Sequence, residues 1–298
     1  MASRRRFLAR RARGKLIVSP PGAGDLLSST ELSGLLARML EDARAAGEIA
    51  MGYFRAGERT SASIANKEGG SPVTEADHRV DAFLKQRLGE ALPAAGWLSE
   101  ETADTDARLS RDLVVIVDPI DGTRGFMHGD ARWAVAIALV AKGRPVLGIV
   151  QLPARGETFS AALGLGAFRN GEPVRVSGRA EIDGALMAGP KSTLDAMARG
   201  GLKFASEPRI PSLAYRLARV AEGSLDVGIA STNACDWDIA AADLIIHEAG
   251  GRLTDMGGSR PEYNRKATRH ELLGAWPAQL HDGMMAALRG ALAIPPKP

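Results

Sequence analysis

Two aspartates three positions apart follow a strongly apolar segment near the middle of the sequence. Asp118 and Asp121 belong to an Asp-Pro-Ile-Asp-Gly-Thr hexapeptide. Carboxylate and main-chain carbonyl oxygens are hard ligands, so these aspartates and the Ile120 carbonyl could hold a divalent cation such as Mg²⁺. Gly122 and Thr123 could direct main-chain N–H groups at a phosphate if a short helix or nest begins there. By itself, the hexapeptide could also be an ordinary aspartate-glycine turn.

Other acidic residues lie beside apolar segments elsewhere in the sequence. Glu100 follows a short apolar piece, and Asp238 lies in the first turn of an apolar helical segment that Gly250 and Gly251 close. Each acid has a plain alternative interpretation, because Glu100 could be a surface acid and Asp238 could complement the helix dipole. Taken together with the hexapeptide, they favour a metal site over a simple turn.

The segments that would position these acids have clear helix and strand patterns. A capping box begins an amphipathic helix that we expect over residues 28–54, and Thr74 caps a second helix. The β-branched run 113–117 predicts a central strand. We expect this strand to end at Asp118, because Pro119 has no N–H to donate to a ladder.

The rest of the chain predicts an α+β or α/β fold in two packed halves. Asn170 and Gly171 form a typical hairpin turn. We expect a short tail over residues 1–25, an α+β half over 26–185 with most metal ligands, and an α/β half over 186–298 with Asp238 and substrate contacts. The expected elements are strands over 134–140, 146–150 and 174–176, then helices over 213–221 and 239–249 around a strand over 225–229.

Basic residues are concentrated at the start of the sequence. The 298-residue chain has a formal net charge of +3 and a pI of about 9.2. Residues 1–24 hold seven cations and no acid, and subtracting these seven from +3 leaves −4 for residues 25–298. The tail resembles a twin-arginine export signal at Arg4 and Arg5, but the apolar stretch of roughly 7 to 15 residues that such a signal needs is missing. We therefore expect a disordered tail.

Composition also limits which class of protein the chain could belong to and which compartment it suits. No stretch reaches the roughly 18 apolar residues of a membrane span. The single cysteine, Cys235, excludes an intrachain disulfide and fits a reducing cytoplasm. A different class of function remains: a protein that recruits RNA or a partner through its basic tail. Against nucleic-acid binding, Phe7 is the one aromatic residue among the tail arginines.

In their order along the chain, these segments resemble the inositol monophosphatase family of lithium-sensitive, Mg²⁺-dependent phosphatases. The resemblance covers roughly residues 30 to 285, and a match in several parts is much more specific than a single motif. It implies a layered αβαβα sandwich with the site between its halves, and homodimers are common in the family. The matching segments are 71–77, 98–101, 118–123 with Phe126, and 237–238 through 248–251.

The resemblance also implies roles for individual residues. In the family, a metal-bound water attacks the phosphate, and Glu100 and Thr123 would orient it here. Two to three Mg²⁺ ions are expected. The implied ligands are Glu100, Asp118 and the Ile120 carbonyl for the first ion, Asp118, Asp121 and Asp238 for the second, and Asp77 with Glu100, through water, for a third.

Other phosphatase chemistries fit the sequence less well. An aspartyl-phosphate enzyme needs acids two positions apart, whereas Asp118 and Asp121 are three apart. A cysteine phosphatase needs a thiolate in a phosphate-binding loop, and the acids after Cys235 would repel phosphate. His128 and His247 are interpreted as surface or packing residues, because neither has a second histidine at zinc-site spacing.

The substrate is a small soluble phosphate monoester whose identity the sequence indicates only weakly. Inositol phosphatases of the family have an acid seven positions before the Trp-Asp aspartate, where this chain has Ser231. Arg216 could contact a second phosphate, although it could equally be an exposed helix cation. We therefore favour a 3'(2'),5'-bisphosphate nucleotidase over an inositol-1-monophosphatase. Asp195 could supply the missing acid, and histidinol phosphate and fructose 1,6-bisphosphate stay open as substrates.

Overall fold

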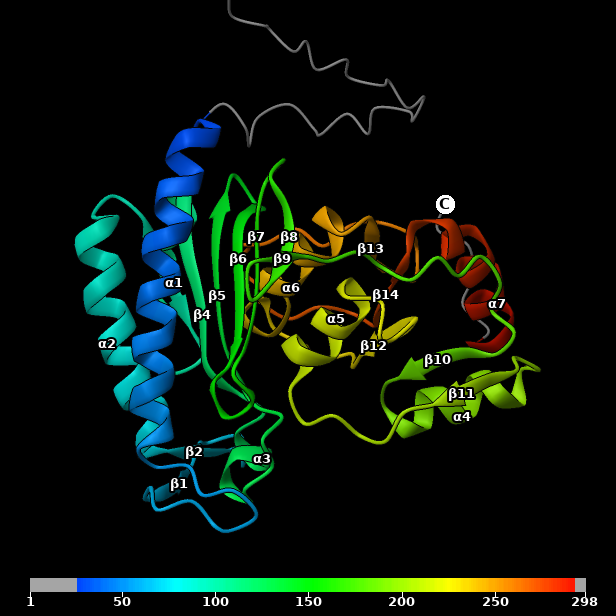
Figure 1. The fold of residues 1–298 in the computed structure, drawn as a ribbon, viewed down its shortest axis with the longest axis horizontal. Helices are drawn as coiled ribbons and strands as arrows, with labels where there is room; N and C mark the ends of the chain where they lie inside the picture. The colour runs from blue at the N-terminus through cyan, green and yellow to red at the C-terminus, as the bar shows by residue number, and fades with distance from the viewer. Residues whose placement is uncertain (1–25, 293–298) are drawn as a thin grey trace, which may run out of the picture.

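The computed structural model describes residues 26–292, which form five layers (Figure 1). Helices α1 and α2 cover one face of a seven-stranded sheet, and α5 and α6 lie between its other face and a five-stranded sheet. Helices α4 and α7 cover the outer face of the smaller sheet. This is the αβαβα sandwich that the resemblance implied. The helices are α1 (Ser29–Met51), α2 (Glu75–Ala91), α3 (Thr123–Met127), α4 (Lys191–Arg199), α5 (Leu213–Ala221), α6 (Asp236–Glu248) and α7 (His281–Leu292).

The larger sheet follows the chain order, and all its neighbours are antiparallel except β3 and β4. Its strands are β3 (Gly96–Ser99), β4 (Leu113–Asp121), β5 (Ala134–Ala141), β6 (Arg144–Leu152), β7 (Glu157–Ala162), β8 (Gly166–Arg169) and β9 (Glu172–Pro173).

The smaller sheet has the order β11-β10-β12-β14-β13, and a separate hairpin precedes α2. The strands of the smaller sheet are β10 (Ala185–Ala188), β11 (Phe204–Ser206), β12 (Val227–Ala230), β13 (Gly251–Asp255) and β14 (Leu273–Pro277), and the hairpin joins β1 (Ile64–Asn66) to β2 (Pro72–Thr74). Three 3₁₀ segments complete the described fold: Asp106–Ser110, Pro153–Arg155 and Ala278–Leu280.

Strand β4 is apolar on both faces because helices cover it on both sides. Val114 and Ile116 lie in the cluster that includes α5 and α6, whereas Val115 and Val117 lie in the cluster that includes α1 and α2. Successive strand residues alternate between faces, so residues of even number here point toward α6. This alternation places Asp118 on the α6 side of the sheet.

Helix α6 lies unusually close to the larger sheet. A Cβ atom added at Gly148 of β6 would come within 2.4 Å of the Ala241 carbonyl oxygen of α6. Glycine is therefore required for the helix backbone to rest on the strand at this point. The cluster around α6 contains residues of both sheets, so the two halves expected on either side of residue 185 share apolar contacts through this helix.

Several sequence expectations are confirmed and others need correction. The α5 helix has the predicted bounds, and Asn170 and Gly171 both have positive φ angles of 51° and 84°, as a tight hairpin turn requires. The strand expected to end at Asp118 instead continues to Asp121, and residues 174–176 form no strand. The predicted helix over 239–249 begins three residues earlier, at Asp236. The expected tail, residues 1–25, lies outside the described residues.

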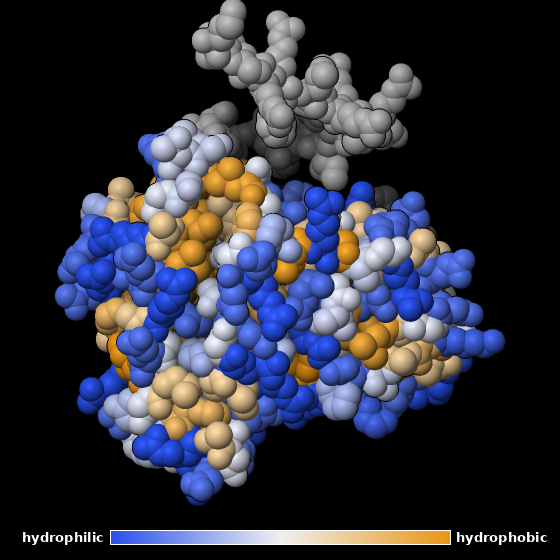
Figure 2. Space-filling model, in the orientation of Figure 1, coloured by the Kyte–Doolittle hydropathy of each residue, from blue (hydrophilic) through white to orange (hydrophobic). Residues whose placement is uncertain are grey.

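The surface of the described residues is mixed. Figure 2 shows hydrophilic residues over most of one face, with apolar residues in separate groups between them. Of the helices within residues 26–292, none combines the length and the apolar character that a membrane crossing would need.

Candidate active site

A bulge in β4 brings Asp118 and Asp121 to the same side of the sheet. Asp118 pairs with Ala136 and Asp121 with Ala134, so three steps along β4 match two steps along β5. In a regular strand, residues three apart would point to opposite faces, and the extra residue of the bulge cancels that alternation. Ile120, inside the bulge, packs into the cluster beneath α1 and α2. Both carboxylates are therefore free to face α6.

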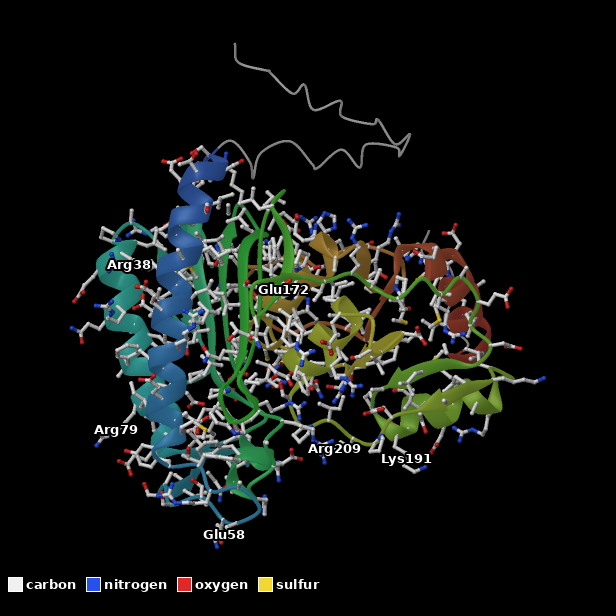
Figure 3. All side chains as sticks on the ribbon, in the orientation of Figure 1. Arg38, Glu58, Arg79, Glu172, Lys191 and Arg209 are labelled. Carbon is white, nitrogen blue, oxygen red and sulfur yellow. The ribbon has the colours of Figure 1, made fainter. Side chains whose placement is uncertain are left out.

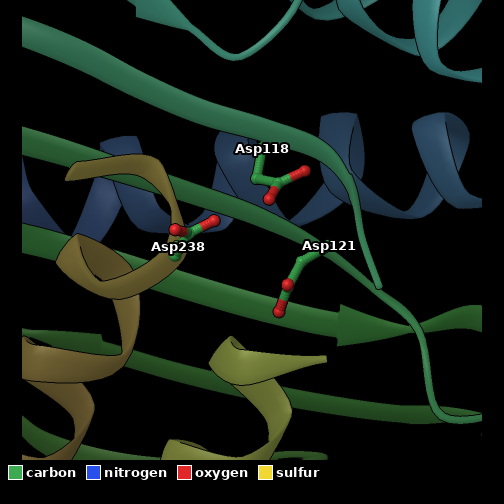
Figure 4. Close-up of side chains that lie close together, drawn as sticks. All are labelled: Asp118, Asp121 and Asp238. Carbon is green, nitrogen blue, oxygen red and sulfur yellow. The ribbon is translucent and has the colours of Figure 1, made fainter. Parts of the chain in front are cut away.

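Asp238 of α6 completes a carboxylate cluster with the two aspartates of β4 (Figure 4). One carboxylate oxygen from each of Asp118, Asp121 and Asp238 lies within 4.8 Å of the others. Asp238 is the third residue of α6, and its Oδ2 accepts a hydrogen bond of 2.6 Å from the Cys235 main-chain N–H at the helix start. We call Asp118, Asp121 and Asp238 the carboxylate cluster.

The three carboxylates of the cluster are buried close to one another, which disfavours their charged forms. Burial is the largest cause that raises the pKa of Asp118 and of Asp238 well above their usual range, and neighbouring carboxylates add to it. Burial also raises the pKa of Asp121 to about 6, although hydrogen bonds from Ser212 and the main chain oppose the shift. Crowded carboxylates of this kind are stabilised as anions by a divalent cation, and their oxygens are the ligands that Mg²⁺ prefers. The donor set therefore fits a metal centre.

Asp77 and Glu100 lie at the margin of the cluster. Both act electrostatically on Asp118, and Asp77 is fully buried. The Oδ2 atom of Asp77 caps α2 by accepting from the Thr74 N–H at 2.8 Å, whereas its buried Oδ1 has no hydrogen-bond partner among the described residues. Burial raises the pKa of Asp77 to about 7. A buried carboxylate oxygen without a partner again fits a nearby cation or its water.

Lys67 is a site residue that the sequence reasoning missed. Its Nζ atom lies 2.8 Å from Glu100 Oε1 and 2.7 Å from Glu101 Oε1. Lys67 lies at the turn of the β1–β2 hairpin, so a short strand pair brings an ammonium group to the acids that follow β3. A lone lysine in a glycine-rich loop gives no sequence signal of such a contact.

Gly122 and Thr123 turn the chain from β4 into α3. Gly122 has a positive φ of 91°, and a Cβ there would lie 3.0 Å from the Ser212 main-chain nitrogen. Both facts require glycine. The Thr123 hydroxyl donates to the Ile120 carbonyl at 3.1 Å. The N–H groups of Gly125 and Phe126 donate to the Gly122 carbonyl, so the N–H groups of Thr123 and Arg124 are the leading ones without an acceptor inside the helix. The short helix anticipated at Thr123 is present.

Asp121 also caps helix α5. Its Oδ2 atom accepts hydrogen bonds from the Ser212 hydroxyl at 2.5 Å and from the Ala214 main-chain N–H at 2.6 Å. Ser212 is the N-cap of α5 and accepts from the Tyr215 N–H. The start of α5 is thereby fastened to the carboxylate cluster. Serine before an apolar helix is a recognisable cap, but nothing local in the sequence indicates its contact with Asp121.

A cavity of about 980 Å³ opens beside α4, and we call it the α4 cavity. Arg216, Ser231 and Asp195 all line it, together with Lys191 and Arg209. Figure 3 shows Lys191 and Arg209 along the lower edge of the molecule in that view. Arg216 lies one helical turn beyond the α5 cap, and Ser231 leads into the loop before α6, so the cavity adjoins the elements that carry the carboxylate cluster.

Arg216 is held inside the protein rather than exposed on its helix. Nη1 donates to the Ile229 carbonyl and Nη2 to the Ile210 carbonyl, each at 2.9 Å. Its buried Nε has no acceptor among the described residues, and burial lowers the pKa of the guanidinium. Asp195, the acid considered for ring hydroxyls, forms an exposed ion pair of 2.7 Å with Lys191.

Cys235 is no nucleophile in this setting. Burial, followed by the negative charge of Asp238, raises the pKa of its thiol to about 12, so the thiol stays protonated at neutral pH. His247 lies at the end of α6, away from the cluster at its start, and burial lowers its pKa. Nδ1 of His128 lies 2.7 Å from the Arg124 carbonyl oxygen of α3. The two histidines are not brought together.

The fold is an αβαβα sandwich, and clustered carboxylates that could hold metal ions lie between its two sheets. Together, this fold and this site define a class of phosphatases. The chain belongs to the inositol monophosphatase family, which residues 32–292 match. It is 35% identical over 262 residues to inositol monophosphatase 2 of Solanum lycopersicum, a match that covers 84% of this chain and 96% of that protein. It is also 35% identical over 233 residues to the histidinol-phosphatase of Mycobacterium tuberculosis, covering 73% and 85%.

Solved structures agree with this assignment. The extragenic suppressor protein suhB from Bartonella henselae superposes with a TM-score of 0.75 at 29% identity, covering 86% of this chain and 98% of that one. The comparisons establish the family. The relatives carry names for different substrates, so the substrate of this chain is a separate question.

Proposed function

We propose that this phosphatase is a Mg²⁺-dependent phosphomonoesterase that hydrolyses a small phosphorylated metabolite at the carboxylate cluster. The observation that carries the proposal is the convergence of three acidic side chains from β4 and α6 to within 4.8 Å of one another. Two to three ions are proposed, with Asp118, Asp121, Asp238, Glu100 and the Ile120 carbonyl as the principal ligands. Asp77, with its unpartnered oxygen, would hold the outermost ion through water.

When bound, Mg²⁺ supplies a water of lowered pKa and neutralises charge on the phosphate oxygens. The protein itself would supply the groups that orient the water, face the phosphate and hold the ligands in place. Glu100 and the Thr123 hydroxyl would orient the attacking water, and the first N–H groups of α3 would face a phosphate oxygen. The bulge in β4 fixes Asp118 and Asp121 on the same side of the sheet through main-chain pairing, so the ligands need little reorganisation during the reaction.

The α4 cavity supports a substrate that carries a second phosphate, such as a 3',5'-bisphosphorylated nucleoside. Four cationic side chains line it, against the two acids Asp195 and Glu207. Ser231 faces the cavity at the position where an inositol phosphatase of the family has an acid. Arg216 adds a buried guanidinium that pairs with main-chain carbonyls. The cationic residues are Lys191, Lys203, Arg209 and Arg216.

The experiment has two parts. Purified protein should release phosphate with Mg²⁺, lose this activity in excess chelator and be inhibited by Li⁺. Full turnover in chelator would refute the metal chemistry. At saturating Mg²⁺, kcat/KM should be higher for adenosine 3',5'-bisphosphate than for inositol 1-phosphate, by about tenfold for each charge-assisted hydrogen bond to the second phosphate. An equal or reversed ratio would favour an inositol-1-monophosphatase and leave the metal chemistry intact.

A further inference from the structure

The first turn of α6 contains two aspartates that point in different directions. Asp238 joins the carboxylate cluster, whereas Asp236, two residues earlier, lies about 200° around the helix from it. Asp236 is 1% exposed, and its Oδ1 atom lies 2.7 Å from Nε2 of His270. Its Oδ2 accepts from the Asn264 main-chain N–H at 3.0 Å. Asp236 therefore ties the helix start to the segment 264–270.

This segment also holds the main chain just before α6. The Asp236 N–H donates to the Thr268 carbonyl at 2.9 Å, and the His270 N–H donates to the Ala234 carbonyl at 2.8 Å. These two bonds flank an isolated antiparallel bridge between the N-cap residue Cys235 and Arg269. The turn that carries Asp238 is thus anchored by main-chain and side-chain contacts to one loop.

Arg108 connects that loop to the chain that follows Glu100. Its Nε and Nη2 atoms donate to the two carboxylate oxygens of Asp104, each at 2.7 Å. Its Nη1 donates to Asn264 Oδ1 at 2.8 Å, and the Asn264 amide donates back to the Arg108 carbonyl at 3.2 Å. The Arg108 side chain is 2% exposed, so a buried and well-bonded guanidinium joins the two segments.

We propose that Arg108, Asn264 and Asp236 are positioning residues that set the place of Asp238 relative to Glu100. The path runs from the segment after Glu100, through these three side chains, into the first turn of α6. This inference rests on the proposed metal centre, because it assigns the path a role in metal binding. Partners that hold a ligand in place typically change metal affinity by about 10- to 100-fold when they are removed.

Asp243 provides a matched control on the same helix. It is also 1% exposed, and it accepts from the Tyr263 hydroxyl at 3.1 Å and lies 3.3 Å from Nε of Arg260. It lies seven residues from Asp236, about two helical turns away, so its contacts hold the middle of α6 instead of the start. Asp236→Asn and Asp243→Asn remove the same charge from equally buried sites.

The test measures Mg²⁺ binding to the full chain by isothermal titration calorimetry, with melting temperatures recorded alongside. Asp236→Asn should weaken Mg²⁺ binding about tenfold. Asp243→Asn should lower the melting temperature by a similar amount and leave Mg²⁺ affinity within about twofold, because it acts far from a ligand. Equal losses of affinity in the two variants would overturn the positioning role.

A milder variant covers the case in which Asp236→Asn does not fold. Asn264→Gly removes the side-chain contacts to Arg108 and keeps the main-chain N–H that reaches Asp236, and glycine suits the φ of 57° at this position. It too should weaken Mg²⁺ binding more than Asp243→Asn does, and unchanged affinity would overturn the proposal. A wild-type chain that binds no Mg²⁺ would refute the proposed function itself, which is a different result from equal losses in the variants.

Discussion

The carboxylate cluster and the α4 cavity are built from different parts of the fold. Asp118, Asp121 and Asp238 come from β4 and α6, in the middle of the sandwich, and each accepts a main-chain hydrogen bond. The cavity is lined by α4, β11 and the loops around them, where the Lys191 side chain is 87% exposed. The difference indicates that the core fixes the hydrolytic chemistry, while lining residues can change the preferred substrate at little cost to the fold.

The largest effect should come from the cluster. Asp118→Asn keeps the shape of the side chain and removes a charged ligand, so phosphate release should fall by about 10³-fold or more. Asp195→Asn removes an acid from the cavity wall and should change the same rate only a few-fold. Rates at limiting Mg²⁺ test both. Wild-type turnover by the Asp118 variant would remove this residue from the ligand set and break the comparison.

Arg216 should affect the choice of substrate more than the chemistry. We expect Arg216→Ala to lower the ratio of kcat/KM for adenosine 3',5'-bisphosphate over inositol 1-phosphate by about tenfold, through loss of a charge-assisted hydrogen bond. Arg169→Ala is the control, because Arg169 pairs at 3.0 Å with Glu222 at the end of the same helix, and neither residue lines the cavity. Similar ratios in the two variants would show that Arg216 only supports the fold.

Acidity should affect the folding stability of the protein when no metal is bound. Burial raises the pKa of Asp77 to about 7 and of Asp121 to about 6, well above the values expected in the unfolded chain. Between pH of about 4 and 7 the folded state therefore holds protons that the unfolded state has released, and its stability falls as pH rises.

In calorimetric melting with chelator, these two carboxylates should therefore lower the melting temperature as the pH rises to 7. Asp77→Asn should remove part of that decrease. Saturating Mg²⁺ should abolish the effect, because metal binding displaces the protons. A pH dependence that is the same with and without Mg²⁺ would argue against a metal at these carboxylates.

The smallest effect should come from the basic tail. Deleting residues 1–24 removes seven cations but leaves the capping box at Ser28 and every residue of the cluster and the cavity. We expect kcat/KM within about twofold of wild type and a melting temperature within about 1 °C, since the tail has no core-forming pattern. A large loss of either quantity would mean that the tail contributes to the site or the core.

Local signals predicted much of the fold, and long-range contacts account for what they missed. The caps at Ser28 and Thr74 and the run 113–117 are local patterns, and the structure has the corresponding elements. The bulge depends on how β4 pairs with β5, so the local rule that proline ends a strand places the end of β4 too early, at Asp118. The alternative of an exposed Arg216 was wrong for a similar reason, because the carbonyls that hold it belong to other segments.

The sequence alone predicts the three residues of the carboxylate cluster, because each lies in a short family motif whose residues are contiguous in the sequence. Arg108 was missed because its partner Asn264 lies 156 positions away. Lys67 was missed because a hairpin of two three-residue strands gives almost no pattern. In both cases the contact is made by the fold, and no spacing rule within one element would reveal it.

The double use of Asp121 has a consequence for how binding curves should be read. One of its oxygens holds the start of α5, and one turn farther along that helix Arg216 lines the cavity. A cation on Asp121 and an occupant of the cavity therefore act on the same helix. Thermodynamic linkage is reciprocal, so the factor by which the metal tightens the occupant must equal the factor by which the occupant tightens the metal. Each half-saturating concentration should then shift with the concentration of the other ligand, and neither is a constant of the protein alone.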